Sequence, residues 1–263
     1  MALIHPSSIV HPSAEIADDV EIGPFCTVGE FAKLGSKTRL ISHVVIEKWT
    51  ELGENNEVSP GVVLGGPPQD RKYHGERSFL RIGDNNLIRE CVTIHRASGE
   101  GTVTHVGNNN FLMTYMHIGH NCTVGSNITI GNSVAVAGHV RIEDFANFGG
   151  LTGVHQKVRV GKYAMVGGMT RANVDVPPFM IVEGNPMKVK EINAVGLRRA
   201  GVSPETRMAL RKAGKILFRS HSNLSNAIDM VENEIELFPE VVYLLDFMRC
   251  LRNGRFGRAQ DVP

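Results

Sequence analysis

Aliphatic side chains recur at every sixth residue through the first two thirds of the chain. Counting in sixes from Ile4, the first eleven positions are all aliphatic. The same phase continues to Val166, and of these 28 positions only three are not apolar: Asp70, Glu76 and Glu100. An α-helix repeats every 3.6 residues and a plain strand every two, so neither produces this pattern. A period of six is typical of the hexapeptide repeats of a parallel β-helix.

The repeat predicts an all-β solenoid in the form of a prism of stacked coils. One aliphatic side chain per hexapeptide points inward, and three hexapeptides complete a coil, so residues 18 apart should stack on one another. Breaks in the pattern near residues 65–81 and 96–105 leave its phase unchanged, and they predict loops extruded from complete coils. Because a prism offers little else, these loops are candidates for function.

The period ends within residues 174–186, which divides the chain into a predicted β-helix (1–186) and a C-terminal helical domain (187–263). Ser203 and Pro204 have the residue types of an N-cap and a first helical position. Further helices are expected near residues 224–237 and 240–252. The tail carries 13 Lys and Arg against 9 Asp and Glu. We expect it to cap the open end of the solenoid, with docking of a partner as an additional role.

Composition limits the class of protein. The net charge of +1 and the 6% aromatic content give no indication of nucleic-acid binding. Four widely spaced cysteines fit free thiols in a reducing compartment. The first residues do not have the pattern of a secretion signal, and no apolar run approaches the ~18 residues that span a bilayer. We therefore expect a cytoplasmic protein without stable membrane insertion.

Four histidines lie outside the inward positions and should gather on three consecutive coils. Coil arithmetic places His120 beside His139, and His139 beside His155 and Gln156, while His117 precedes an inward isoleucine. Three chemistries could use such a cluster. The imidazoles could bind zinc, a nearby thiol could act as a nucleophile, or one histidine could act as a general base at neutral pH. Cys122 lies next to His120, but its position favours a small packed side chain.

Several segments in fixed order resemble one family over essentially the whole chain. They are "GGPPQDRKYHGE" (65–76), "IGDNNLIRECVTIHR" (82–96), "MHIGHNCTVG" (116–125), "GLTGVHQ" (150–156), "DVPPF" (175–179) and "GLRRAG" (196–201). Together they resemble the UDP-N-acetylglucosamine O-acyltransferases, which catalyse the first step of lipid A biosynthesis. The resemblance implies a β-helix that coils left-handed, an exception to the usual crossover rule.

The resemblance assigns roles to individual residues. His120 matches the general base that takes the proton from the sugar 3-hydroxyl. Asn193 and Arg199 match groups that hold the uridine diphosphate end, and His155 lines the phosphopantetheine and acyl groove. Contacts to the nucleotide sugar are implied for Gln69, Asp70, Lys72, His117, His139 and Gln156.

The resemblance also implies partners. The donor would be a (R)-3-hydroxyacyl group on acyl carrier protein, whose phosphopantetheine makes a separate cofactor unnecessary, and no metal is implied. The acceptor would be a UDP-sugar, and a homotrimer would place sites between subunits. The position that limits acyl length matches Gly168, and the neighbouring Met169 could fold back into the groove.

Four residues depart from the family pattern. Asn121 stands where an aspartate usually follows the catalytic histidine. Pro186, Val195 and Ala200 differ at the nucleotide and sugar end, so the acceptor could instead be a 3-amino sugar that forms an amide. A zinc-dependent hydratase and a non-catalytic solenoid are the alternatives from other classes.

Overall fold

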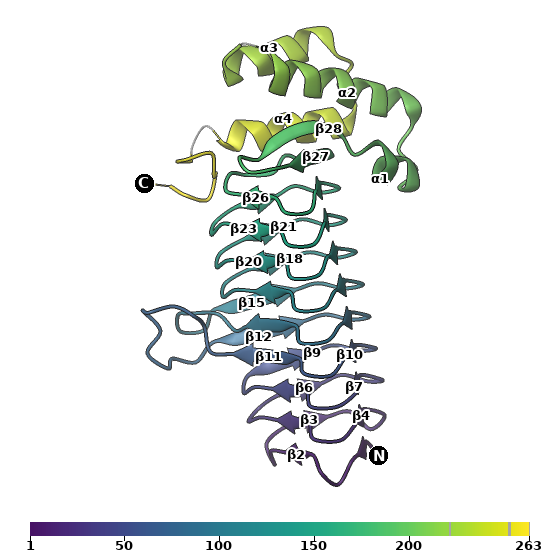
Figure 1. Cartoon of the computed structure of the whole chain (residues 1–263), viewed down its shortest axis with the longest axis vertical. Coiled ribbons are helices and arrows are strands. Elements are labelled where there is room, and N and C mark those ends of the chain that lie inside the picture. The colour runs from purple at the N-terminus through teal and green to yellow at the C-terminus, as the bar shows by residue number, and fades with distance from the viewer. Residues whose placement is uncertain (221, 252–253, 263) are drawn as a thin grey trace.

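Residues 1–220, 222–251 and 254–262 are described by a computed structural model, which shows a left-handed parallel β-helix with helices at its C-terminal end (Figure 1). Within those residues the short strands form three sheets of 11, 9 and 8 strands. Each sheet extends along the long axis of the molecule, with its strands stacked one coil above the next. The predicted fold class is confirmed.

The strands of each sheet are given in stacking order. The first sheet contains β1 (Leu3–Ile4), β4 (Glu21–Ile22), β7 (Arg39–Leu40), β10 (Glu57–Val58), β13 (Leu87–Ile88), β16 (Phe111–Leu112), β19 (Thr129–Ile130), β22 (Asn147–Phe148), β25 (Met165–Val166), β27 (Met180–Glu183) and β28 (Lys188–Ile192). The second sheet contains β2 (Ile9–Val10), β5 (Thr27–Val28), β8 (Val45–Ile46), β11 (Val63–Gly66), β14 (Thr93–His95), β17 (His117–Ile118), β20 (Ala135–Val136), β23 (Gly153–Val154) and β26 (Arg171–Ala172). The third sheet contains β3 (Glu15–Ile16), β6 (Lys33–Leu34), β9 (Thr50–Leu52), β12 (Phe79–Ile82), β15 (Val103–Val106), β18 (Thr123–Val124), β21 (Arg141–Ile142) and β24 (Arg159–Val160).

Strand pairing confirms the predicted coil of three hexapeptides. Ile4 pairs with Ile22, and Val10 pairs with Val28. The periodic aliphatic residues point inward and are almost all buried. The residue two positions earlier is buried as well, as with Cys26 before Val28. Each hexapeptide therefore contributes two inward side chains, where the periodicity alone predicts one.

Two loops interrupt the coils without shifting their phase. Leu52 pairs with Ile82, and Ile82 pairs in turn with Val106. The first of these steps is longer than a plain coil by two hexapeptides, and the second is longer by one, so each insertion is a whole number of repeats. The first loop (residues 67–78) and the second loop (residues 96–102) are shorter than the expected 65–81 and 96–105, because residues 79–82 and 103–106 already pair as strands.

Left-handed backbone at the corners positions the outward side chains. His43, Trp49 and Asn55 have φ values of 53°, 60° and 52°, a conformation that non-glycine residues rarely adopt. Their backbone N–H groups donate to carbonyls of the previous coil, as from His43 to Pro24 at 3.0 Å. Corner side chains therefore form columns along the prism, one residue per coil.

The C-terminal part covers one end of the prism. It contains α1 (Ala194–Arg199), α2 (Pro204–Arg219), α3 (Leu224–Glu234) and α4 (Pro239–Cys250) (Figure 1). Its core joins Phe179 and Met180 from the last coil to Leu210 of α2 and Leu244 of α4.

The boundaries of this part differ in places from the expected ones. β28 lies beyond residue 186 and pairs antiparallel with β27, so the first sheet continues into the predicted helical domain. The predicted start of α2 is confirmed, because the Ser203 side chain accepts a hydrogen bond from Thr206 N at 3.1 Å. α3 and α4 end before the expected residues 237 and 252, and residue 252 lies outside the described residues.

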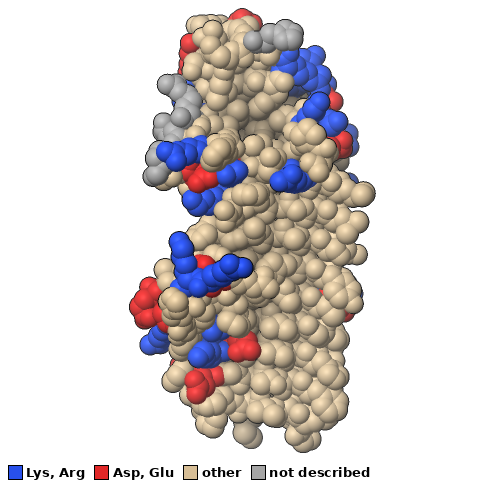
Figure 2. Space-filling view, turned by 60° about the vertical axis from the view of Figure 1, so that its left-hand side comes forward, with Lys and Arg blue, Asp and Glu red and all other residues tan. Residues whose placement is uncertain are grey.

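Charged side chains are unevenly distributed over the molecule. On the face shown in Figure 2 they gather at the helical end and at the level of the extruded loops, while most of the coil surface between them is uncharged. Among the described residues, none of the helices combines the length and the apolar character needed to cross a membrane.

Candidate active site

A groove of about 550 Å³ runs along the outer face of the second sheet. Thr93, His117, Ala135, Gly153 and Arg171 follow one another in register from β14 to β26. The two small residues in the middle leave the face open between a histidine at one end and an arginine at the other. The corner residues that also line the groove are His120, His155 and Gln156, and the first loop adds Gln69.

The His120 ring is held by its neighbour Asn121, with Nδ1 lying 2.8 Å from the amide oxygen Oδ1. Ser98 N–H donates to the same Oδ1 at 2.9 Å, and Ser98 O accepts from Nδ2 at 3.1 Å. Since a backbone N–H only donates and a carbonyl only accepts, these contacts define which end of the amide is oxygen. Nδ1 of neutral His120 must therefore carry the proton, and Nε2 has a free lone pair.

Asn121 replaces the aspartate that is usual in the family, but it still orients the His120 ring. The sequence predicts that His120 lacks the usual carboxylate partner. In the structure an amide oxygen takes that place and orients the ring without adding a negative charge. The free Nε2 lies over Gly138, where a β-carbon would approach it to 2.7 Å. Only glycine at this position leaves the ring where it is.

Ser98 also connects His120 to the first loop. Its hydroxyl donates to Asp70 Oδ2 at 3.0 Å, and Lys72 N donates to Asp70 Oδ1 at 3.0 Å. These two hydrogen bonds, the backbone one first, lower the pKa of the Asp70 carboxyl below its usual value. A single serine therefore links the Asp70 carboxylate to Asn121, the hydrogen-bond partner of the His120 ring.

His117 and His95 form a second pair of imidazoles. His117 Nδ1 lies 2.8 Å from the hydroxyl of Thr93, and its ring meets His95 edge to face at 4.8 Å. Burial lowers the pKa of His117, and the neighbouring His120 lowers it further. Burial also lowers the pKa of His95 to about 4, and its Nδ1 is buried without a hydrogen-bond partner among the described residues. Both rings are neutral near pH 7.

His139 packs against His120, whereas Cys122 points into the core of the prism. The His139 ring packs edge to face against that of His120 at 5.1 Å, and burial lowers its pKa. Cys122 has no exposed surface, its Sγ donates to Ala137 O at 3.1 Å, and burial raises its pKa to about 12. The prediction of a packed cysteine is confirmed, because a buried thiol of this kind is not a nucleophile.

Four other predicted site residues do not line this groove: Asn193, Arg199, Gly168 and Met169. Asn193 is buried, and its amide groups are engaged: Oδ1 caps α1 at Gly196 N, and Nδ2 donates to Tyr163 O at 2.9 Å. Arg199 is exposed at the end of α1. Gly168 and Met169 lie at a corner next to the second sheet, and Met169 is 74% exposed.

Sequence reasoning missed four residues that shape the groove. Ser98 lies in the second loop, which is outside the repeat, so counting in sixes cannot predict which residues it lies near. Thr93 and Arg171 are outward residues of the second sheet, and counting coils from His117 would have found both. His95 stands directly after an inward isoleucine, and the same count would have placed it near His117.

No three histidine, cysteine, aspartate or glutamate side chains converge as metal ligands within residues 1–220, 222–251 and 254–262. His117 Nδ1 and His120 Nδ1 are already engaged by Thr93 and Asn121. The groove thus combines the unengaged Nε2 of His120, the nearby Asp70 carboxylate and the Arg171 guanidinium.

Comparison with known proteins bears on the whole chain. A family model described as "Udp N-acetylglucosamine O-acyltransferase; Domain 2" matches residues 175–256. The acyl-[acyl-carrier-protein]–UDP-N-acetylglucosamine O-acyltransferase of Gloeothece citriformis is 47% identical over 84% of this chain and 79% of its own. The enzyme of the same name from Thermodesulfovibrio yellowstonii is 48% identical over 82% of this chain and 84% of its own.

A solved structure gives the same result. The UDP-N-acetylglucosamine acyltransferase of Bacteroides fragilis superposes with a TM-score of 0.92 at 37% identity, covering 99% of this chain and all of that one. Both the repeat region and the helical end are therefore shared with these enzymes. The chain belongs to the acyl-[acyl-carrier-protein]–UDP-N-acetylglucosamine O-acyltransferase family.

Proposed function

We propose that this protein transfers a (R)-3-hydroxyacyl group from acyl carrier protein to the 3-hydroxyl of UDP-N-acetylglucosamine, in the first step of lipid A biosynthesis, with His120 as general base. The observation that carries the role of His120 is its fixed tautomer. Asn121 holds the Nδ1 proton, so the Nε2 lone pair faces the groove.

The reaction needs no covalent enzyme intermediate. His120 Nε2 takes the proton of the sugar hydroxyl as the oxygen attacks the thioester carbonyl. The new C–O ester bond forms, the C–S bond breaks, and the imidazolium returns its proton to the leaving thiolate. Gly138 lies next to His120 Nε2. Its backbone N–H has no hydrogen-bond partner among the described residues, so it is a candidate donor to the developing oxyanion.

The remaining groups bind rather than react. Asp70 is a hydrogen-bond acceptor for the sugar, held by Ser98. Gln69 and Gln156 offer amides at either side of the groove, Lys72 adds a cation on the first loop, and His155 lines the acyl arm. Arg171 is exposed at the far end and makes no ion pair within the described residues. A guanidinium there suits a phosphate of either substrate.

We also propose a homotrimer with the groove at the subunit interface. Phe25, Tyr115, Leu151 and Met169 share the corner that precedes the second sheet, and each is more than half exposed. His43, Gly61, Cys91 and Ser133 stand between them on the same corner, so they form an interrupted apolar column. Exposed apolar residues gathered along one corner are typical of a contact surface. Since Asn193 and Arg199 do not reach the groove of their own chain, a neighbouring copy is needed for Arg199 to meet the nucleotide.

Mass spectrometry of the reaction product tests this proposal. The purified protein is incubated with a panel of UDP-sugars and with acyl carrier proteins that carry acyl chains of graded length. We expect an ester of UDP-N-acetylglucosamine. His120→Ala should lower kcat/KM by ~10²- to 10⁴-fold, without loss of stability because the ring is outside the core. Cys122→Ala is the matched control and should keep its activity. An inactive but stable Cys122→Ala would contradict the mechanism, as would activity of His120→Ala within a few-fold of the parent.

A further inference from the structure

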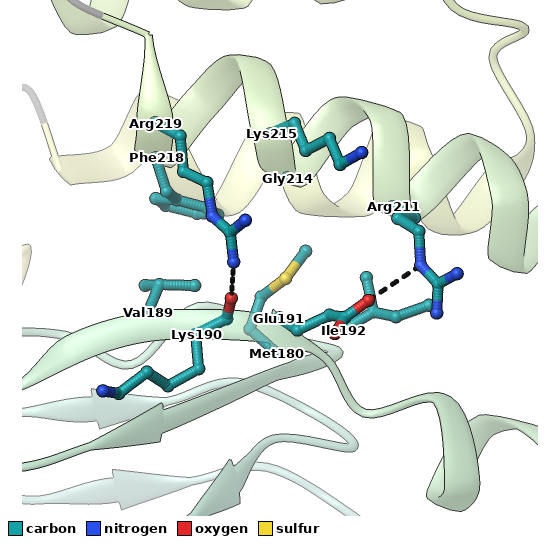
Figure 3. Close-up of a pocket in the computed structure, with 10 residues that line it drawn as sticks. All are labelled: Met180, Val189, Lys190, Glu191, Ile192, Arg211, Gly214, Lys215, Phe218 and Arg219. Atoms are coloured by element: carbon teal, nitrogen blue, oxygen red, sulfur yellow. Dashed lines mark hydrogen bonds and ion pairs between the residues drawn. The ribbon is translucent and has the colours of Figure 1, made fainter.

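A second hollow lies between α2 and β28, away from the second sheet. β28 is the last strand of the first sheet and pairs with β27 alone among the described residues. α2 packs across it. The cavity between them measures about 290 Å³. Figure 3 shows α2 crossing above the strand, with Met180 directed into the space below Gly214. None of the residues discussed above as substrate ligands lines it.

Gly214 lets Met180 pack closely under α2 at the edge of this hollow. It lies in the interior of a 16-residue helix, where glycine costs about 1 kcal/mol relative to alanine. A β-carbon at this position would lie 3.2 Å from Met180 Cε and 3.4 Å from its Sδ. The missing side chain therefore makes room for the Met180 side chain, which packs directly under the helix, and a larger residue here would push Met180 into the neighbouring cavity.

Contacts at both ends hold the helix across the gap. The Arg219 guanidinium donates to the backbone carbonyl of Lys190, and Arg211 Nε pairs with Glu191 at 2.9 Å (Figure 3). Each contact joins α2 to β28 on one side of Gly214. The hollow is thus framed by the fold and does not depend on a single flexible side chain.

The rim carries an excess of positive charge. Arg211, Lys215 and Arg219 of α2 border the opening, and Glu191 is the only acidic residue among those that line it. The Lys190 side chain is directed away from α2 and lies 3.9 Å from Glu183 (Figure 3). Lys215 makes no ion pair within the described part of the chain. Cations gathered over a partly enclosed space repel one another and attract an anion.

The floor beneath these charges is apolar. Met180, Val189, Ile192 and Phe218 line the cavity below the rim. The volume lies near the lower end of the range for small-molecule sites. An apolar floor under a cationic rim matches a ligand whose charge is at one end and whose other end is hydrocarbon.

We propose that this cavity binds a small amphipathic anion, a single phosphate or carboxylate on a short hydrocarbon body. The head group is held by Lys215 and the rim arginines through charged hydrogen bonds, which are stronger than neutral ones. The hydrocarbon lies against Met180 and Phe218 in the cavity beside Gly214. The site is separate from the groove on the second sheet and does not depend on the transfer reaction.

Isothermal titration of the full chain with hexyl phosphate tests the proposal, with inorganic phosphate as the head group alone. We expect one saturable site per chain for hexyl phosphate, present equally with and without saturating UDP-N-acetylglucosamine. Inorganic phosphate should bind at least about tenfold more weakly, because burial of two methylenes already supplies that factor.

Two variants localise the binding. Gly214→Leu places a side chain in the hollow and keeps high helix propensity, and Lys215→Gln removes one cation from the rim. Each should weaken hexyl phosphate binding at least about tenfold. Lys212→Gln, on the same helix but outside the cavity, is the matched control and should bind like the parent. Circular dichroism melting checks that every variant is folded.

Three results would overturn the proposal. One is the absence of saturable hexyl phosphate binding to the parent at millimolar concentration. Another is undiminished binding to folded Gly214→Leu. The third is equal affinity for inorganic and hexyl phosphate, which would leave no role for the apolar floor.

Discussion

At the scale of single residues, the histidines differ in what holds them. His120 is oriented by an amide oxygen, His117 by a hydroxyl, and His95 Nδ1 has no partner among the described residues. Burial keeps His95 and His117 neutral at pH values where an exposed imidazole would begin to protonate. Neighbouring imidazoles therefore differ in environment: Nε2 of His120 is unengaged among the described residues, while His95 and His117 are held neutral by burial.

Replacing the neutral partner of His120 with a charged one should change the pH profile. In Asn121→Asp a carboxylate would lie against Nδ1 and stabilise the imidazolium, which raises a histidine pKa. The base form then predominates only at higher pH, so the acidic limb of kcat/KM should move upward. Initial rates between pH 5 and 9 measure this. An unchanged or lower limb would show that residue 121 does not set the basicity of His120.

His95 should make stability depend on pH. Its pKa of about 4 in the folded chain lies below the ordinary value of about 6.5. Between these values the unfolded chain binds more protons, so the free energy of unfolding falls as pH drops from 6.5 towards 4. Urea unfolding at fixed protein concentration should show a shallower fall in His95→Asn. An identical slope in parent and variant would assign the effect to other groups.

At the scale of elements, the two loops act through their contact with each other. The second loop supplies Ser98, which bonds Asp70 of the first loop and Asn121 of the coil. The loops thus position a carboxylate and a histidine that the prism alone would leave apart. Because each insertion is a whole number of hexapeptides, the loops do so without disturbing the stack above.

A double-mutant cycle on Ser98 and Asp70 tests this connection. Ser98→Ala removes the hydroxyl and should raise the KM for the UDP-sugar several-fold, while the KM for the acyl donor stays near that of the parent. Asp70→Asn should do the same. If the two residues act together, the double variant is no worse than Asp70→Asn. Fully additive effects would mean that Ser98 does not act through Asp70.

The elements also show which features the sequence can predict. The six-residue period specifies coil, phase and the approach of His139 to His120, because those residues are separated by uninterrupted repeats. Ser98 lies inside an insertion, so no count of repeats places it beside Asn121. The cap at Ser203 is local and was predictable. The short helix α1 was not predicted. Its N-cap residue Asn193 also donates a hydrogen bond to Tyr163 O, a contact between segments 30 residues apart that no local pattern indicates.

At the scale of the whole molecule, the proposed trimer makes acyl length a property of the interface. Gly168 presents no side chain at the corner that bears the apolar column, so a chain lying there meets no block. Gly168→Met should shift donor preference shorter by two or more carbons, since each methylene that no longer fits loses roughly 0.8 kcal/mol. Met169→Ala is the companion variant. A donor profile unmoved by Gly168→Met would place the limit elsewhere.

The two ends of the prism differ in how far their apolar side chains are covered, and this difference bears on the order in which the coils form during synthesis. The C-terminal coil is covered by helices, whereas Leu3, Ile4 and Ile9 at the other end remain exposed. In a stack where each coil contacts mainly its neighbours, we expect the coils with exposed aliphatic residues to lose structure more readily than those packed under the helices. Synthesis runs from the uncovered end to the covered one. Until the helices emerge from the ribosome, every newly formed coil is itself the open edge of the sheets, a surface that can pair with another chain.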